Sequence, residues 1–504
     1  MMDNVFVGQV IGASLVLCSL LWLVLAHPRI PKGAPPGTFG WPVLGETLDY
    51  LNLRYKSGAA TFFNERRKKY GVDVFRTHVF FSPTVVIAGA DAHKLLQNDG
   101  YRSLTFGHFS TMKDLFGEKS LILTEADQHK RMRKAVMGSM NWKVLKSHIP
   151  TLEELSIETL RSWEGKEVSA SEEFAKVLSL SLSLSLSQDE YLLRYHIYLC
   201  DLLQFTFYSI LGLLLSLKPS PHTEILRRDF LVLAKYGVSL PLKISGTNYS
   251  RALQARRRLL DGLKKVLDDR RKNGNPSEDV LDHLMQPREI TGSDSHLSDE
   301  EIVDNIIFFI FAGYETTSTA LARIMQLLAD HPHELNLVKA EQKRILQELG
   351  KENFLTWEKV KSMHYTSMVI NEALRLSNLG TEVILRTAKH DIAFHGYTIP
   401  RGWNIMIDKT ATDNNPEIFK EPLKFKPARF EENLPPYVFT PFGGGVRICA
   451  GMDFANLEML VFIHTLVNNY SWRLTQKNND ELEFTGVVQK PKNGIPIIVQ
   501  RLSE

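Results

Sequence analysis

A single cysteine lies in a glycine-rich stretch near the carboxyl end of the chain, where residues 442–451 read FGGGVRICAG. A cysteine that ligates iron does so as a thiolate, which must be kept apart from other thiols and from bulk water. The glycines before Cys449 let the backbone approach a flat ligand and can aim N–H groups at the sulfur, and Arg447 adds a positive charge suited to a carboxylate. These residues predict a thiolate ligand for iron. The alternative is a buried structural cysteine beside a glycine-rich turn, which is the commoner fate of a lone cysteine.

A helix is predicted directly behind this stretch. Apolar residues recur there at helical spacing, at Phe454, Leu457, Leu460 and Val461. The positive end of the helix dipole would favour the anionic form of Cys449. The start of a helix is therefore expected to position the thiolate.

The stretch around the cysteine also resembles a known signature. Phe442, Gly445, Arg447, Cys449 and Gly451 match F-x-x-G-x-R-x-C-x-G, which is typical of the cytochrome P-450 superfamily. The chain resembles that family over nearly its whole length, except about residues 178–217. The resemblance implies a heme b cofactor (iron protoporphyrin IX) with Cys449 as the axial iron ligand. Further heme contacts are expected from Phe442, Gly443, Arg447 and Ala312.

Residues 312–317, AGYETT, match the family's A/G-G-x-D/E-T-T motif. A glycine in a helix interior costs about 1 kcal/mol, so Gly313 needs either a packing reason or a functional one. In the functional interpretation, small residues leave room for dioxygen above the iron. Glu315 and Thr316 are then the catalytic residues, an acid and a hydroxyl that deliver protons.

The resemblance also implies roles for three other sets of residues. Glu372 and Arg375 match E-x-x-R and, with Arg429, are expected to form a buried network that serves folding and not catalysis. His129 and Arg133 are spaced i, i+4 and are predicted to bind a heme propionate, and Arg386 falls where many members place another propionate ligand. The alternative for each is a solvated basic surface.

Residues 35–47 and 395–403 resemble the plant clan that oxidises sterols, brassinosteroids, terpenoids and abscisic acid. The substrate is therefore expected to be lipophilic and to bind in an apolar pocket. Candidate lining residues are Phe106, Phe109, Met112, Leu115, Phe308, Ala312, Val383 and Ile384.

The elements that position these residues are predicted to be mainly helices, with small β-sheets at one side. Ser298 and Glu301 form a capping box, and Pro332 stops the apolar periodicity that follows, which gives a helix of about 32 residues. A hairpin is predicted in residues 72–88, with its two strands separated by Ser82 and Pro83. Residues 482–485 and 495–499 are predicted to pair with each other.

Three segments differ from the rest of the chain. Residues 1–27 are predicted to form a transmembrane anchor, because an apolar run is followed by His27, Arg29 and Lys32, which places the catalytic domain in the cytosol. Residues 28–37 form a proline-rich connector, and residues 38–504 form one heme-thiolate monooxygenase domain. Leu178–Ser187 is a Leu-Ser alternation that a CT dinucleotide repeat would encode, so one hypothesis is that it is non-coding sequence. The apolar stretch up to Leu217 is either a packed helix or a second membrane span.

Charge and cysteine content exclude several classes of function. A net charge of +3 without a basic stripe argues against a nucleic-acid partner. Three scattered cysteines, Cys18, Cys200 and Cys449, exclude an iron–sulfur cluster or a four-cysteine zinc site and indicate a reducing compartment.

The implied reaction inserts one oxygen atom from O2 into a C–H bond of a lipophilic terpenoid or steroid. Electrons must come from a partner, because no nucleotide-binding G-x-G-x-x-G follows a strand. The family's usual donor is an NADPH-dependent cytochrome P-450 reductase on the endoplasmic reticulum membrane, where this protein is expected as a single-pass protein. The alternatives are a reductase-independent heme isomerase or dehydratase, and a catalytically dead heme-binding relative.

Overall fold

The computed structural model describes most of the chain, which forms two compact units. The described residues are 30–107, 110–169, 201–237, 241–273, 278–286, 296–349, 355–377, 379, 385–476, 482–484, 489–491 and 495–502. The predicted anchor in residues 1–27 and the repeat Leu178–Ser187 therefore lie outside the described residues. Among the helices that are described, none combines the length and the apolarity needed to cross a lipid bilayer.

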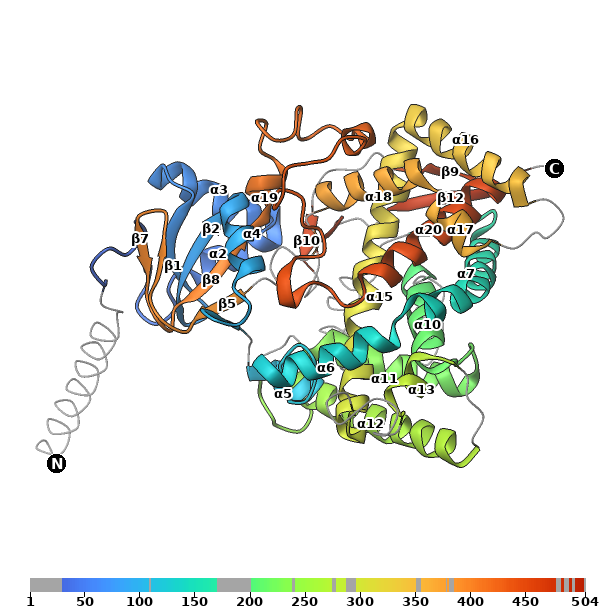
Figure 1. Ribbon diagram of the computed structural model, residues 1–504, viewed down its shortest axis with the longest axis horizontal. Coiled ribbons are helices and arrows are strands. Elements are labelled where there is room, and N and C mark those ends of the chain that lie inside the picture. Colours follow the sequence, from blue (N-terminus) through green and yellow to red (C-terminus); the bar gives the residue numbers. More distant parts are fainter. Residues whose placement is uncertain are drawn as a thin grey trace, which may run out of the picture. The chain divides into compact units, whose positions relative to one another are not determined.

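Unit 1 contains residues up to Gly107 and residues 381–412. A five-stranded sheet in the order β1-β2-β8-β5-β3 forms its centre (Figure 1). The five strands are β1 Val74–Val79, β2 Ser82–Ala88, β3 Leu104–Phe106, β5 Leu385–Ala388 and β8 Asn404–Asp408. Helices α2 Thr47–Ser57, α3 Ala59–Tyr70 and α4 Ala90–Asn98 pack around them, and β6 Ile392–Phe394 pairs with β7 Tyr397–Ile399.

The predicted hairpin is confirmed, with a turn earlier than expected. Strands β1 and β2 pair antiparallel from Val79↔Ser82 outward, so Ser82 and Pro83 begin the second strand and the turn lies at Phe80 and Phe81. Part of the predicted connector also belongs to this unit, because the N–H of Arg76 in β1 donates to the carbonyl of Pro36 at 2.8 Å.

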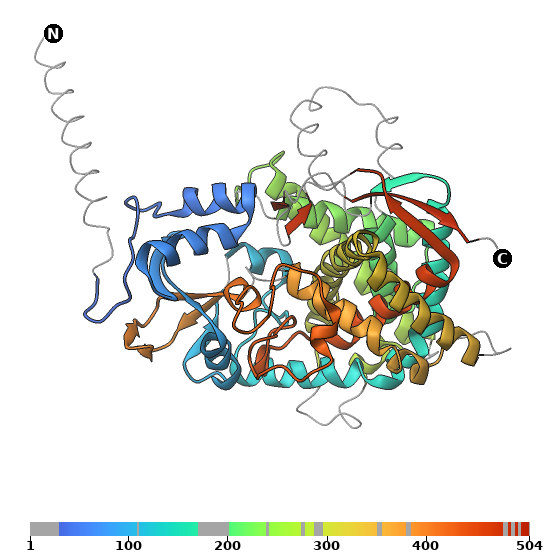
Figure 2. The same ribbon diagram turned by 90° about the horizontal axis from the view of Figure 1, so that it is seen from above.

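Unit 2 contains residues 108–380 and 413–504 and is mainly helical. Its longest helix, α15 Asp299–Asp330, passes through the middle of the unit in both views (Figures 1 and 2). The other helices are α5 Ser110–Phe116, α6 Ala126–Ser139, α7 Trp142–Trp163, α10 Asp201–Leu215, α11 Pro221–Gly237, α12 Asn248–Asn273, α13 Val280–Leu284, α16 Pro332–Leu349, α17 Trp357–Lys361, α18 His364–Leu376, α20 Met452–Asn469 and the short 3₁₀ helices η3 Pro427–Phe430 and η4 Gly445–Arg447. Helix α19 Lys409–Asp413 lies where the chain passes from unit 1 to unit 2.

The prediction for the long helix is confirmed. Ser298 and Glu301 form a reciprocal capping box, and the helix contains 32 residues. The prediction that residues 482–485 pair with residues 495–499 is wrong. Both strands exist, but β10 Leu482–Phe484 pairs with β11 Gln489–Pro491, while β12 Pro496–Arg501 pairs with β9 Tyr470–Leu474 and β4 Glu167–Ser169.

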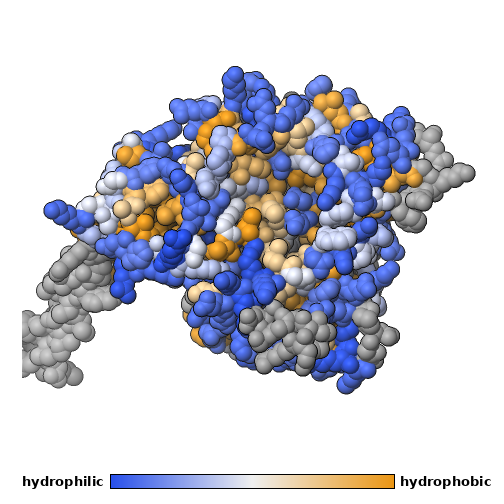
Figure 3. Space-filling model, viewed as in Figure 1, coloured by the Kyte–Doolittle hydropathy of each residue, from blue (hydrophilic) through white to orange (hydrophobic). Residues whose placement is uncertain are grey.

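Helix α10 decides between the two interpretations of the apolar stretch that ends at Leu217. Its apolar side chains, among them Leu202, Phe205 and Leu214, are buried in the same core cluster as those of α7, α15 and α20. The described part of the stretch, residues 201–215, is therefore a packed helix of unit 2. On the face drawn in Figure 3, apolar side chains are visible in the middle, over α15 and α18, whereas hydrophilic ones predominate over α12.

Candidate active site

The loop that carries Cys449 is closed on itself by backbone hydrogen bonds. The N–H of Cys449 donates to the carbonyl of Phe442 at 2.9 Å, and the N–H of Gly443 donates to the carbonyl of Thr440 at 3.0 Å. Gly443 and Gly445 have φ angles of +73° and +64°, a backbone conformation that costs glycine little. A side chain on Gly443 would meet no atom within 4 Å, so the glycine leaves open space beside the loop.

Helix α20 begins three residues after Cys449, as the periodicity predicted. Cys449 is exposed, while desolvation by the protein atoms around its sulfur raises the pKa of the thiol. A backbone hydrogen bond from Gly451 and the positive charge of Arg133 oppose the effect of burial and lower the pKa.

Arg133 contacts the cysteine loop directly. Its Nη1 donates to the carbonyl of Ile448, the residue before Cys449, at 2.7 Å. His129, one turn earlier on α6, is buried. The i, i+4 spacing therefore places both predicted propionate ligands on α6, and Arg133 lies beside the thiolate.

Arg447 binds the segment that precedes α6. Its guanidinium donates to the carbonyls of Leu121, Ile122 and Thr124 at 3.2, 3.4 and 2.5 Å. The cysteine loop is thus fastened to residues 121–124 as well as to α6.

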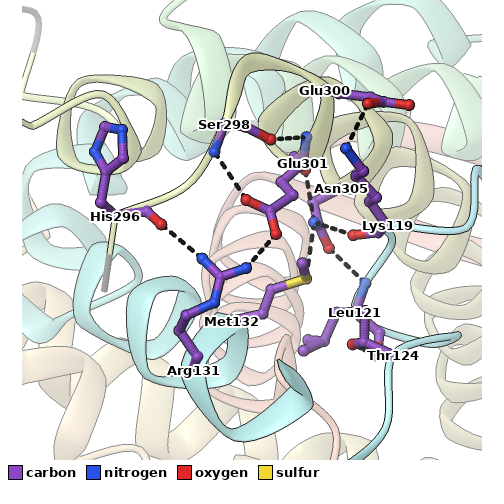
Figure 4. Close-up of polar contacts among 10 residues, drawn as sticks. All are labelled: Lys119, Leu121, Thr124, Arg131, Met132, His296, Ser298, Glu300, Glu301 and Asn305. Carbon is purple, nitrogen blue, oxygen red and sulfur yellow. Dashed lines mark hydrogen bonds and ion pairs between the residues drawn. The ribbon is translucent and has the colours of Figure 1, made fainter. Parts of the chain in front are cut away.

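The same segment is also fastened to α15, through contacts that the sequence analysis did not predict (Figure 4). Asn305 is fully buried, and its amide oxygen accepts from the N–H of Leu121 at 2.8 Å while its amide nitrogen donates to the carbonyls of Lys119 and Glu301. Arg131 pairs with Glu301 and donates to the carbonyl of His296. A polar residue at an apolar position of a helix was the available signal for Asn305.

The middle of α15 has one accessible face on a helix that is otherwise buried. Phe308, Ala312 and Thr316 are partly accessible at i, i+4 and i+8, and the adjacent Phe311 and Gly313 share this property. Glu315 is buried, and the Thr316 hydroxyl donates to the carbonyl of Ala312 at 2.7 Å. An accessible stripe in the centre of a buried helix suits an internal site for a cofactor, dioxygen and a substrate.

Gly313 also has the packing reason that the first interpretation required. A Cβ there would lie 2.6 Å from Cδ1 of Ile210 on α10. Glycine at position 313 is therefore favoured both by the packing of α10 and by the open space that a dioxygen site needs.

The predicted folding network is present in unit 2. Arg375 donates from Nε and Nη2 to the two carboxylate oxygens of Glu372, both at 2.8 Å, and Arg429 Nε donates to Glu372 at 2.9 Å. Glu372 and Arg375 are fully buried. Charge-assisted bonds offset the cost of burying these groups.

The remaining predicted residues lie elsewhere. Arg386 is in β5 of unit 1, where its guanidinium lies over the ring of Phe106 at 5.1 Å. Leu115 is buried in the core of unit 2, and Met112 packs against that core. Phe109, Val383 and Ile384 lie outside the described residues.

The donor set fits a heme. The exposed thiol of Cys449 would provide a ligand for the iron, Arg133 of α6 beside its loop a counter-charge, and the small and apolar accessible residues of α15 an apolar wall.

Comparisons with known proteins agree with this geometry. The family model described as Cytochrome P450 matches residues 35–188 and 224–498. The chain is 33% identical to Cytochrome P450 724B1 of Oryza sativa subsp. japonica, over 98% of both chains. It is 32% identical to Abscisic acid 8'-hydroxylase 1 of Arabidopsis thaliana, over 93% of this chain and 92% of that protein. Among solved structures it resembles retinoic acid bound cyanobacterial CYP120A1, with a TM-score of 0.78 and 28% identity, over 93% of this chain and 99% of that one.

A thiol at the start of α20, a mainly helical fold and relatives of nearly equal length lead to one conclusion. The chain belongs to the cytochrome P450 family and is a monooxygenase that uses heme b, a redox partner, dioxygen and a small-molecule substrate.

Proposed function

We propose that Cys449 is the axial thiolate of the heme iron and that the enzyme inserts one oxygen atom from O2 into a C–H bond of a lipophilic terpenoid or steroid. The observation that carries this proposal is the environment of Cys449. Its exposed thiol lies in the loop just before α20; burial raises the pKa of this thiol, and a hydrogen bond from the backbone of Gly451 and the charge of Arg133 act against that rise.

When bound, the heme supplies the oxygen chemistry, and the thiolate pushes electron density that favours O–O cleavage. The protein's part is to hold charge and move protons. Arg133 and the N–H of Gly451 hold the negative charge on the sulfur. Thr316 on the accessible face of α15 and the buried Glu315 next to it in the sequence carry protons toward the dioxygen site.

His129, Arg133, Arg447 and Arg386 are proposed to bind the heme propionates, and Phe442, Gly443 and Ala312 to contact the ring. The open space beside Gly443 and the accessible Ala312 support close approach of a flat group. Arg447 and Arg133 already donate to carbonyls, so each would share its fork of N–H groups between a carbonyl and a carboxylate.

A lipophilic substrate is supported by the side chains that α15 presents. Phe308 and Phe311 are partly accessible in the middle of the helix and give an apolar wall with few polar anchors. Similarity to abscisic acid 8'-hydroxylases supports a terpenoid substrate, because abscisic acid is named as the molecule that these relatives hydroxylate.

We further propose that residues 1–27 anchor the protein in the endoplasmic reticulum membrane by a single span, with residues 28–37 as connector and residues 38–504 as a cytosolic catalytic domain. An apolar run followed by basic residues supports this arrangement. The electron donor is proposed to be an NADPH-dependent cytochrome P450 reductase in the same membrane.

The test is replacement of the sulfur. The Cys449→Ala variant is expected to lose the red-shifted Soret band that the reduced wild type shows with carbon monoxide, and to lose NADPH-dependent turnover with reductase. The matched control is Cys200→Ala, which removes a cysteine outside the glycine-rich motif and should keep both properties. A Cys449→Ala protein with the wild-type band would contradict the proposal.

A further inference from the structure

Helix α10 touches α15 at the residues proposed to handle dioxygen and protons. The Thr206 hydroxyl, which is buried, lies 2.6 Å from the carbonyl oxygen of Tyr314. One turn further along α10, Ile210 fills the space that a side chain at position 313 would occupy. Both contacts fall within or beside the AGYETT motif.

The Thr206 hydroxyl has one proton and three carbonyl oxygens within reach. Those of Leu202 and Leu203 on its own helix lie at 3.0 and 3.3 Å, and that of Tyr314 is nearer at 2.6 Å. The shortest distance identifies the acceptor as Tyr314, so the hydrogen bond runs from α10 to α15.

The receiving turn of α15 needs support from outside the helix. The Ala312 carbonyl accepts the Thr316 hydroxyl, and the Glu315 carbonyl accepts the hydroxyls of Ser318 and Thr319. Hydroxyls that bond back to carbonyls of their own helix bend it and slightly destabilise it. Along α15 the Tyr314 carbonyl lies between those of Ala312 and Glu315, and the hydroxyl that donates to it belongs to another helix, α10.

Helix α10 is itself fixed firmly enough to act as a support. His148 of α7 donates from Nε2 to the carbonyl of Ser209 at 2.9 Å, and a Cβ on Gly212 would lie 2.8 Å from Cε1 of the same ring. Arg270 of α12 donates to the carbonyl of Leu215 at 2.9 Å, at the end of α10. Contacts on two sides and at one end hold α10 in place.

We propose that Thr206 is a positioning residue for oxygen activation: its hydrogen bond to the Tyr314 carbonyl holds the turn that carries Glu315 and Thr316. The proposal rests on the roles proposed above for those two residues. Thr206 acts through the α15 backbone and does not touch a reacting atom. Its loss is expected to misdirect protons without loss of the fold.

The first experiment measures the α15 backbone by hydrogen exchange of the full-length, heme-loaded protein. Thr206→Val removes the hydroxyl with little change in shape, Thr206→Ser keeps it, and Thr465→Val is the matched control. Thr465 is a buried threonine of α20 whose hydroxyl donates within its own helix, to the carbonyl of Val461 at 3.0 Å. Peptides covering residues 308–322 should exchange about fivefold faster in Thr206→Val than in Thr465→Val or Thr206→Ser, as expected for one lost hydrogen bond.

The second experiment measures hydrogen peroxide released per NADPH oxidised, with reductase, NADPH and dioxygen as the added components. The ratio should rise about threefold in Thr206→Val, because a displaced acid and hydroxyl deliver protons poorly, and Thr206→Ser should restore it. Equal exchange in Thr206→Val and Thr465→Val, or an unchanged peroxide ratio, would overturn the proposal. If the proposed function itself is wrong, the wild-type protein will lack the spectrum of a thiolate-ligated heme. Hydrogen exchange at residues 308–322 tests the contact between Thr206 and Tyr314 whether or not the proposed function holds.

Discussion

Single buried side chains determine how this protein responds to acid. His148 and His464 are buried in unit 2, and burial lowers the pKa of each to about 4. Asp304 near the start of α15 behaves oppositely, because burial raises its pKa to about 6 despite its ion pair with Arg256. The stability that the two neutral histidines contribute to the folded protein is lost as the pH falls. The stability that protonated Asp304 contributes is lost as the pH rises from about 4 to about 6.

His464 provides a test of this effect. Its folded pKa of about 4 lies below the unfolded value of 6.5, so the unfolded chain binds the proton first as the pH falls. The stabilisation is present above pH 6.5 and is lost between 6.5 and about 4, by up to about 3 kcal/mol. His464→Gln, which can keep a hydrogen bond to Gln342, should flatten the dependence of the urea midpoint on pH over this range.

The control for this prediction is His364→Gln, because His364 is exposed and stays in contact with water in both states. If both variants show the wild-type dependence, burial of His464 does not contribute to acid sensitivity.

At the level of helices and strands, local signals were sufficient for some elements and not for others. The bounds of α15 follow from Ser298, Glu301 and Pro332, all of which act within a few residues of the helix ends. The pairing of β12 with β4 could not be predicted, because β4 precedes it by more than 300 residues and the pairing depends on the tertiary fold.

The same distinction holds in the candidate active site. The motif was sufficient to predict the cysteine loop and the start of α20, because the hydrogen bonds that form them join residues a few positions apart in the chain. The contact between Ile210 and Gly313 joins helices about 100 residues apart, so the sequence left the reason for the glycine open. Asn305 and Thr206 escaped prediction because their partners lie on distant segments.

The packing of α10 on α15 can be tested with a double-mutant cycle on stability. A Cβ at position 313 would lie 2.6 Å from Ile210 Cδ1, so Gly313→Ala is expected to destabilise by about 1 kcal/mol despite the better helix propensity of alanine. Ile210→Val removes the clashing carbon, so the double variant should recover about 1 kcal/mol relative to the sum of the single changes. Urea midpoints of the four proteins measure this coupling.

Gly138 in α6 is the matched control, since a Cβ there would meet nothing within 4 Å. Gly138→Ala should be neutral or stabilising by up to about 1 kcal/mol. If Gly313→Ala costs the same in the Ile210→Val background as in the wild type, positions 210 and 313 are not in the contact described.

On the scale of the whole molecule, α6 is the helix through which an electron donor could reach the cysteine loop. One side of α6 carries Arg133, which contacts the loop at Ile448. The outer side exposes Lys130 and Lys134, and Met137 and Trp142 add exposed apolar area where α6 meets α7. Arg131, which lies between these lysines in the sequence, pairs with Glu301. Exposed lysines on α6 and an exposed tryptophan at the start of α7 suit an acidic protein partner.

The two kinds of side chain on this surface should affect reductase binding differently. Reversal of charge in Lys130→Glu with Lys134→Glu should raise the KM for reductase about tenfold at low salt and weaken its dependence on ionic strength, because long-range attraction is screened by ions. Trp142→Ala should raise the KM by a similar factor and leave the salt dependence unchanged, since it removes apolar contact and no charge. Lys343→Glu is the control, because it reverses an exposed charge on α16, a helix that lies apart from α6 in Figure 1. Titrating reductase at several salt concentrations separates the electrostatic effect of the lysines from the apolar effect of Trp142. If Lys343→Glu alters the salt dependence equally, the attraction comes from the net charge of the protein and not from α6.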